Sequence, residues 1–170
     1  FLEYDDEFNK YWVKNGKEYA ECYEDVDIFL PIVVQTNAES NFVDLTNQAV
    51  WANQFSDEMG YLDTEALLRY QNFTINGMVM KTESYKSIGG LKKNIELTFT
   101  YEFLLRATYN SLVVSTIPKT GYKHVNEREG SLFESYKKKM SREDTITWLN
   151  KAKKEYYFTK DREITFDDNE

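Results

Sequence analysis

The chain has 170 residues, of which 41% are hydrophobic and 16% aromatic, and its formal net charge is −8. This composition argues against intrinsic disorder and predicts one folded domain over residues 1–170. The negative charge argues against a nucleic-acid partner, because a phosphate-binding surface needs clustered Lys and Arg, and the basic residues here are scattered among acids.

Neither a membrane span nor a disulfide framework is predicted. No apolar run approaches the roughly 20 residues of a spanning helix, and the longest, Ile28–Val34, has the length of a buried strand. Cys22 is the only cysteine, which excludes an internal disulfide and fits a reducing compartment, so we expect a cytoplasmic protein. The abrupt apolar start indicates that the natural chain begins upstream of Phe1.

The N-terminal segment Phe1–Glu7 runs from apolar residues into an acidic cluster, which consists of Glu3, Asp5, Asp6 and Glu7. A buried strand that ends in such a cluster presents several hard oxygen ligands at one place, and this suits a divalent cation that carries phosphates. An isolated Asp-Asp pair is more often a solvated turn. The cation site therefore depends on whether later residues converge on the cluster.

Further along the chain, the hydrophobic pattern predicts alternating strands and helices. The expected elements of the first half are a short helix or loop over 10–23, a strand over Ile28–Val34, two short helices within Asn47–Tyr70 that are interrupted near Gly60, a strand over Phe73–Met80 and a short helix over Glu83–Ile88.

The expected elements of the second half are a Gly89–Gly90 turn, a helix from about Thr100 to Asn110, a strand over Leu112–Ile117 that stops at Pro118, and a last helix over 141–158. Ser141 is the expected N-cap of that last helix, with Asp144 three residues on, and the apolar stripe of the helix is Leu149, Ala152 and Tyr156. The acidic tail 161–170 is expected to be frayed.

Several of these segments, in this order, resemble family 2 inverting glycosyltransferases of the GT-A fold. The resemblance covers about residues 1–135 and rests on the acidic strand end, Val79–Leu91, Tyr101–Arg106, Ile117–Pro118 and Tyr122–His124. It implies an α/β fold with a Rossmann-like mixed sheet flanked by helices. Members begin with a strand and loop that bind the nucleobase, so the chain would lack that N-terminal half.

The resemblance also implies a donor site. An Asp-any-Asp type motif, which binds metal and sugar nucleotide in the family, falls on Glu3, Asp5 and Asp6, and the expected ion is Mg²⁺ or Mn²⁺. His124 would reach the metal or the pyrophosphate from a mobile loop, together with Arg128 and Ser131. A lone histidine is more often structural, and Arg128 has a plain alternative as a surface ion pair with Glu127 or Glu129.

The catalytic base departs from the family pattern, because Phe99 and Thr100 stand where members usually carry a Glu-Asp pair. An inverting transferase needs a carboxylate near the acceptor hydroxyl. Glu102, which matches a second acidic position of the family, is the first substitute, and Glu96 is the second.

The acceptor side would include Trp51, Gly77 and Gly90. Gly77 allows something to approach the backbone closely, and Gly90 belongs to the family's Gly-Gly turn. Trp51 is the best aromatic candidate because amides suited to sugar hydroxyls surround it, at Asn47, Gln48 and Asn53.

We therefore expect a metal-dependent hexosyltransferase that moves a sugar from a nucleotide-diphosphate donor to a hydroxyl of a glycan or another acceptor, in polysaccharide biosynthesis. The alternative is a non-catalytic carbohydrate-binding or structural module on the same scaffold. The loss of the acidic pair before the helix favours the module. The acidic strand end and His124 favour the enzyme. A metal-dependent hydrolase is less well supported, because one histidine gives few nitrogen ligands.

Overall fold

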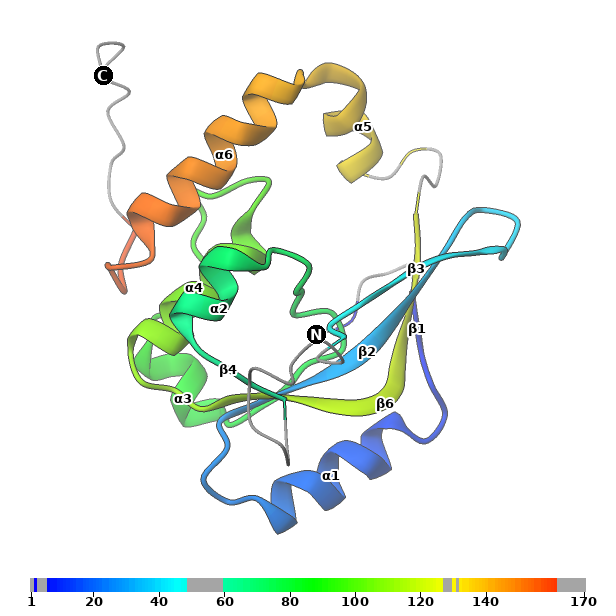
Figure 1. The fold of residues 1–170 in the computed structure, drawn as a ribbon, viewed down its shortest axis with the longest axis vertical. Helices are drawn as coiled ribbons and strands as arrows, with labels where there is room; N and C mark the ends of the chain where they lie inside the picture. Colours follow the sequence, from blue (N-terminus) through cyan, green and yellow to red (C-terminus); the bar gives the residue numbers. More distant parts are fainter. Residues whose placement is uncertain (1, 3–5, 49–59, 127–129, 131, 162–170) are drawn as a thin grey trace.

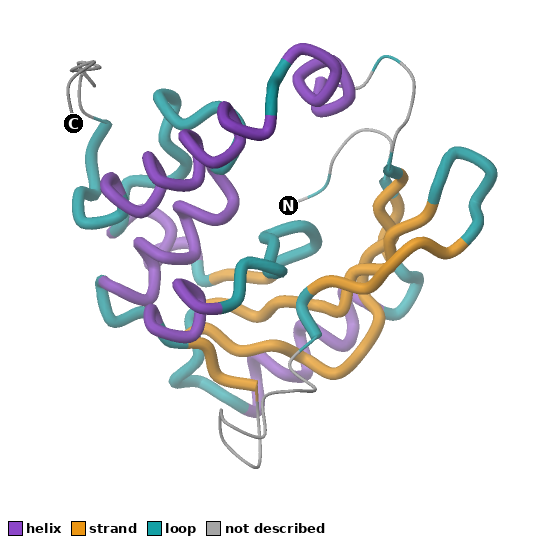
Figure 2. The backbone as a smooth tube through the Cα atoms, turned by 45° about the horizontal axis from the view of Figure 1, so that its top comes forward, coloured by secondary structure: helices purple, strands orange, loops and turns teal. Residues whose placement is uncertain are grey.

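The structure is a computed structural model that describes residues 2, 6–48, 60–126, 130 and 132–161. A mixed sheet lies at the centre, with helix α1 (Trp12–Cys22) on one side and most of the other helices on the opposite side (Figures 1 and 2). This is the mixed α/β architecture with flanking helices that the sequence predicts, and among the described residues no helix is long and apolar enough to cross a membrane.

The sheet has six strands, in the order β1-β6-β2-β3, with β4 paired to β6 and β5 paired to β2. Among the strand pairs of the described residues, only β2–β6 is parallel. The strands are β1 (Glu7–Phe8), β2 (Ile28–Thr36), β3 (Phe42–Thr46), β4 (Gly60–Leu62), β5 (Val79–Met80) and β6 (Val114–Val125). Strand β2 is a nearly continuous apolar run because helices cover both of its faces along its first half.

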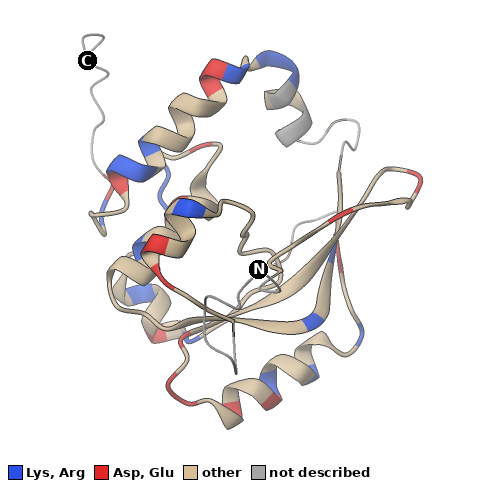
Figure 3. Ribbon diagram, viewed as in Figure 1, with Lys and Arg blue, Asp and Glu red and all other residues tan. Residues whose placement is uncertain are grey.

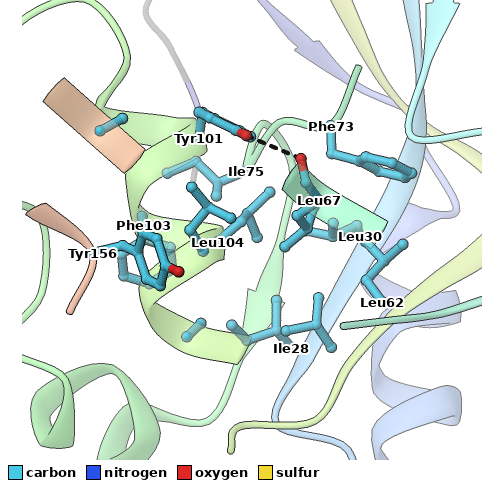
Figure 4. Close-up of a cluster of buried hydrophobic side chains, with 14 of the residues drawn as sticks. Ile28, Leu30, Leu62, Leu67, Phe73, Ile75, Tyr101, Phe103, Leu104 and Tyr156 are labelled. Carbon is cyan, nitrogen blue, oxygen red and sulfur yellow. Dashed lines mark hydrogen bonds between the residues drawn. The ribbon is translucent and has the colours of Figure 1, made fainter. Parts of the chain in front are cut away.

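The larger hydrophobic core lies between the sheet and the helices α2 (Thr64–Arg69), α4 (Phe99–Tyr109) and α6 (Arg142–Glu155). Ile28 and Leu30 of β2 face Leu104 of α4 in this core (Figure 4). The hydroxyl of Tyr101 donates a hydrogen bond to the carbonyl of Leu67 at 3.0 Å. Each fully buried aliphatic side chain here contributes roughly 1.5–3 kcal/mol.

A second core lies on the other face, where Trp12 of α1 packs against Phe29 and Ile117. The indole N–H of Trp12 donates to the carbonyl of Gly77 at 2.7 Å. A Cβ atom at Gly121 would lie 2.5 Å from the Trp12 ring, so this position has room for glycine only. These contacts hold α1 and the segment before β5 against β6.

The remaining helices are α3 (Thr82–Ser87) and α5 (Leu132–Lys139). Most predicted elements are confirmed: 10–23 contains α1, Ile28–Val34 lies in β2, and α3, α4 and α6 match their expected ranges within a few residues. Ser141 and Asp144 form the expected capping box. The Gly89–Gly90 turn is also confirmed, since both glycines have left-handed φ values of 81° and 68°.

The strand predicted over Phe73–Met80 is wrong, because only Val79 and Met80 pair, with β2. Side chains satisfy much of the preceding backbone instead: Asn47 bonds the N–H and the carbonyl of Thr74, and Trp12 bonds the carbonyl of Gly77. Gly77 has a φ of 74°, which no strand adopts.

Two more expectations need correction. Instead of two helices, the described part of Asn47–Tyr70 forms β4 and then α2; residues 49–59 lie outside the described residues. The strand predicted to stop at Pro118 continues to Val125. It continues because the β2–β6 register jumps between Ile117 and Thr120, so Pro118 lies in an irregularity where its missing N–H breaks no ladder bond.

Candidate functional site

The acidic N-terminal segment and the only histidine meet at the edge of the sheet. Strand β1 pairs antiparallel with the end of β6, which brings Asp6 beside His124, 118 residues later in the chain. The Asp6 carboxylate lies 2.8 Å from Nδ1 of His124, and its other oxygen accepts the backbone N–H of Val125 at 3.1 Å. His124 therefore lies on a strand, not on the mobile loop that the sequence predicted.

Electrostatics fix the protonation of this Asp6–His124 pair. Burial alone would raise the pKa of Asp6, but hydrogen bonds from His124 and from the N–H of Val125 outweigh it and hold the pKa below its ordinary 3.8. Asp6 is thus ionised at neutral pH. Because an ionised carboxylate only accepts hydrogen bonds, Nδ1 of His124 carries a hydrogen and donates a hydrogen bond to Asp6.

A carboxylate that accepts one ring N–H of a histidine, as Asp6 does here, is also the arrangement that orients histidines whose other ring nitrogen binds a metal. The side chain of Asp6 is fully buried, whereas that of His124 is 26% exposed. Among the described residues no group of three or more His, Cys, Asp or Glu side chains could hold a metal ion. The other predicted donor-site residues, Glu3, Asp5, Arg128 and Ser131, lie outside the described residues, as does Trp51.

Glu102 lies elsewhere, in a fully buried ion cluster. Its two carboxylate oxygens accept N–H groups of Arg106, each at 2.9 Å, and one of them also lies 3.0 Å from Nζ of Lys92. Arg106 donates further to the carbonyls of Ile88 and Gly90, and Lys92 donates to the carbonyl of Glu155 at 2.6 Å. We call Glu102, Arg106 and Lys92 the buried ion cluster.

Within the buried ion cluster, Glu102 has a structural role. The cluster joins α4 to the Gly89–Gly90 turn and to the end of α6, and the Glu102 side chain has no solvent-exposed surface. Its assignment as catalytic base stays a prediction. Glu96 is exposed in the segment before α4, where its charge acts on Lys151 of α6. No bond between either glutamate and the Asp6–His124 pair is present in the described part of the chain.

Both predicted acceptor glycines lie against protein side chains. A Cβ atom at Gly77 would lie 2.9 Å from Pro31 and Tyr122, and one at Gly90 would lie 3.0 Å from the ring of Tyr85. Their acceptor role stays a prediction. Asn47, expected to offer its amide to a sugar, is fully buried, and its amide is used by Pro31 and Thr74, so that expectation is wrong.

Sequence reasoning missed Gln35 and Asn126, which lie at the ends of β2 and β6 beside His124. The Asn126 amide donates to Oε1 of Gln35 at 2.7 Å, and Gln35 is in register with His124. The signal that could have found them is the parallel pairing of two long strands, which brings both carboxyl ends to one edge. The sequence does not predict this pairing, because Pro118 indicates the end of a strand whereas β6 continues to Val125.

Comparison with known proteins gives no family for this chain: no family model matches it, and no curated protein is significantly similar in sequence.

Proposed function

We propose that the protein is a glycosyltransferase of the GT-A type, which moves a sugar from a nucleotide-diphosphate donor to an acceptor hydroxyl. The observation that carries this proposal is the contact between Asp6 and His124, because an acidic segment indicates a cation site only if a distant residue converges on it. Their place at the carboxyl ends of β2 and β6 adds support, since ligands of open α/β sheets bind there. The single cysteine fits a cytoplasmic location.

In this proposal Asp6 and His124, with Asp5, hold Mg²⁺ or Mn²⁺, and the ion supplies charge neutralisation for the diphosphate. Asp6 also orients the His124 ring through the 2.8 Å hydrogen bond. Glu3, Arg128 and Ser131 remain the proposed contacts to the sugar nucleotide, and Trp51, Gly77 and Gly90 those to the acceptor. Glu102 or Glu96 is the proposed base that takes the proton of the acceptor hydroxyl.

The second candidate is a non-catalytic carbohydrate-binding or structural module, and the buried ion cluster favours it. A base must reach the proton that it removes, whereas both oxygens of Glu102 are held by cations in a place without solvent. Phe99 and Thr100 replace the usual acidic pair at the start of the same helix. In such a module the scaffold would be retained, and Glu102, at the family's second acidic position, would stabilise the fold and would not act as a base.

Titration with Mn²⁺ separates the two candidates. For the transferase, the whole chain should bind Mn²⁺, and uridine diphosphate should strengthen that binding because the diphosphate adds oxygen ligands. Asp6→Asn should weaken binding at least about tenfold, as losses of 10- to 100-fold follow changes near metal ligands. Asp25→Asn, which changes an exposed acid before β2, is the matched control. Equal Mn²⁺ affinity in the Asp6 and Asp25 variants would refute the metal assignment.

A further inference from the structure

A row of polar side chains crosses the sheet where the parallel strands β2 and β6 end. Gln35 of β2 is in register with His124 of β6 on one side and with Asp44 of β3 on the other. Registered neighbours place their side chains on the same face of a sheet. Asp6 and Asn126 extend the row through their hydrogen bonds to His124 and Gln35. We call these five residues the polar row.

The amides of the polar row are fixed but only partly used. The bond from Asn126 to Gln35 sets both amide planes, and the backbone N–H of Asn126 is also held, by the carbonyl of Thr36 at 2.7 Å. Among the described residues, no other hydrogen bond engages the NH₂ group of Gln35 or Oδ1 of Asn126. Both side chains are half-buried, so the NH₂ group of Gln35 and Oδ1 of Asn126 are a donor and an acceptor that a ligand can use.

The charges around the polar row are one-sided. Residues 28–48 contain no Lys or Arg, but they include Asp44 and Glu39, and the ribbon in Figure 3 shows acidic but no basic residues on the β2–β3 hairpin. Asp6, at the other end of the row, is paired with His124 and is a proposed metal ligand, so the negative charge that faces a sugar comes from Asp44. Lys123 of β6 lies 3.9 Å from Glu7, which offsets its charge. A ligand with its own carboxylate would be repelled by this surface.

We propose that the polar row binds the sugar ring of an uncharged hexose and selects against acidic sugars such as uronates. The donor–acceptor pair of Gln35 and Asn126 suits two adjacent ring hydroxyls, since each hydroxyl both donates and accepts. Asp44 supplies the discrimination against a sugar carboxylate. The inference rests on the proposed function for its ligand class, and it adds which sugars the site accepts.

The test uses two probes that differ only at C6, methyl glucoside and methyl glucuronoside, titrated into the whole chain and followed by chemical shift changes. The glucoside should bind at least about threefold more tightly than the glucuronoside, the ratio expected for one unscreened carboxylate within several ångströms. Asn126→Ala should weaken glucoside binding at least about fivefold, the effect of losing one hydrogen-bonding amide. Asn41→Ala, at an exposed amide in the turn of the same hairpin, should leave it unchanged.

Asp44→Asn should strengthen glucuronoside binding about threefold and leave glucoside binding unchanged. Glu39→Gln, an exposed acid in the hairpin turn, is its control. Thermal unfolding of each variant checks that it is folded, and Asn126→Gln provides a second variant that keeps the amide.

The outcomes separate this inference from the proposed function. The polar row is refuted if Asn126→Ala binds the glucoside as tightly as wild type does and wild type binds the two sugars equally. A Mn²⁺ site that depends on Asp6 would in that case still support the transferase. If the sugar preferences appear but uridine diphosphate never strengthens Mn²⁺ binding, the polar row stands and the transferase is refuted. If neither sugar binds, the polar row is refuted.

Discussion

Two parts of the molecule pair an acid with a basic side chain, and they use the pair differently. In the buried ion cluster, Glu102 has no exposed side-chain surface and pairs with Arg106 and Lys92. Arg106 and Lys92 also donate hydrogen bonds to backbone carbonyls of the Gly89–Gly90 turn and of α6. In the Asp6–His124 pair, the acid is buried but the imidazole reaches solvent. The first arrangement stabilises a helix packing, whereas the second presents an oriented ring at a sheet edge. An acidic residue at a family-like position therefore does not by itself mark a reactive one.

The largest expected effect follows Glu102→Gln. Arg106 and Lys92 would keep their charges in the core without a counter-ion, so the free energy of unfolding should fall by about 3–5 kcal/mol. Urea unfolding measures this change. Glu65→Gln is the control, because Glu65 pairs with Arg69 at 3.1 Å on the surface of α2 and should contribute at most about 0.5 kcal/mol.

The same variant could reverse the comparison. If Glu102→Gln is as stable as the Glu65 control and yet lowers sugar transfer by about 10²- to 10⁴-fold, Glu102 is the base and its structural role is wrong.

A second prediction tests how well the core around α4 excludes water. Burial raises the pKa of Tyr101 to about 12. A raised folded-state pKa contributes stability that is complete below the ordinary value of 10.0 and is lost as the pH rises toward 12, so unfolding free energy should drop by roughly 2–3 kcal/mol over that range. Tyr101→Phe should cost about 1 kcal/mol at neutral pH through the lost bond to Leu67 and should flatten the alkaline loss. An equal alkaline loss in both proteins would contradict the assignment to Tyr101.

The smallest change in unfolding free energy is expected at the Asp6–His124 pair. Asp6→Asn should lower the unfolding free energy by about 1–2 kcal/mol at pH 7, because the charged hydrogen bonds to His124 and Val125 weaken. The folded-state pKa of Asp6 is depressed, so its contribution is present above 3.8 and is lost as the pH falls below that value. The difference between Asp6→Asn and wild type should therefore shrink in acid. A difference that stays constant down to about pH 2 would mean that the lost stability is not ionic.

The sequence predicted elements well where the pattern is local. The capping box at Ser141, the apolar stripe through Ala152 and the left-handed Gly89–Gly90 turn all depend on residues near each other in the chain. The sequence-based prediction failed where side chains from distant parts of the sequence, and not a neighbouring strand, bond the backbone. The segment before β5 reads as a strand, but the side chains of Asn47 and Trp12 bond its backbone instead.

The candidate site followed the same rule. Asp6 and His124 were identified by residue type, and their contact required the β1–β6 pairing that no local pattern contains. Gln35 and Asn126 were missed because their partnership depends on a register that continues past Pro118. Arg106 lies four residues after Glu102 on the same helix, so a local pattern contains this contact, whereas Lys92 comes from the segment before α4 and reaches Glu102 only through tertiary packing.

The bond from Lys92 to the last carbonyl of α6 also has a consequence for how the chain acquires its structure during synthesis. The buried ion cluster has one more positive than negative charge, and the carboxyl end of α6 offers the negative pole of a helix dipole to offset it. While residues beyond α4 are still being made, Lys92 lacks that partner. We therefore expect a nascent chain that ends before α6 to keep Lys92 in water and the helices around α4 loosely docked, so that the larger core becomes stable only when Glu155 has left the ribosome.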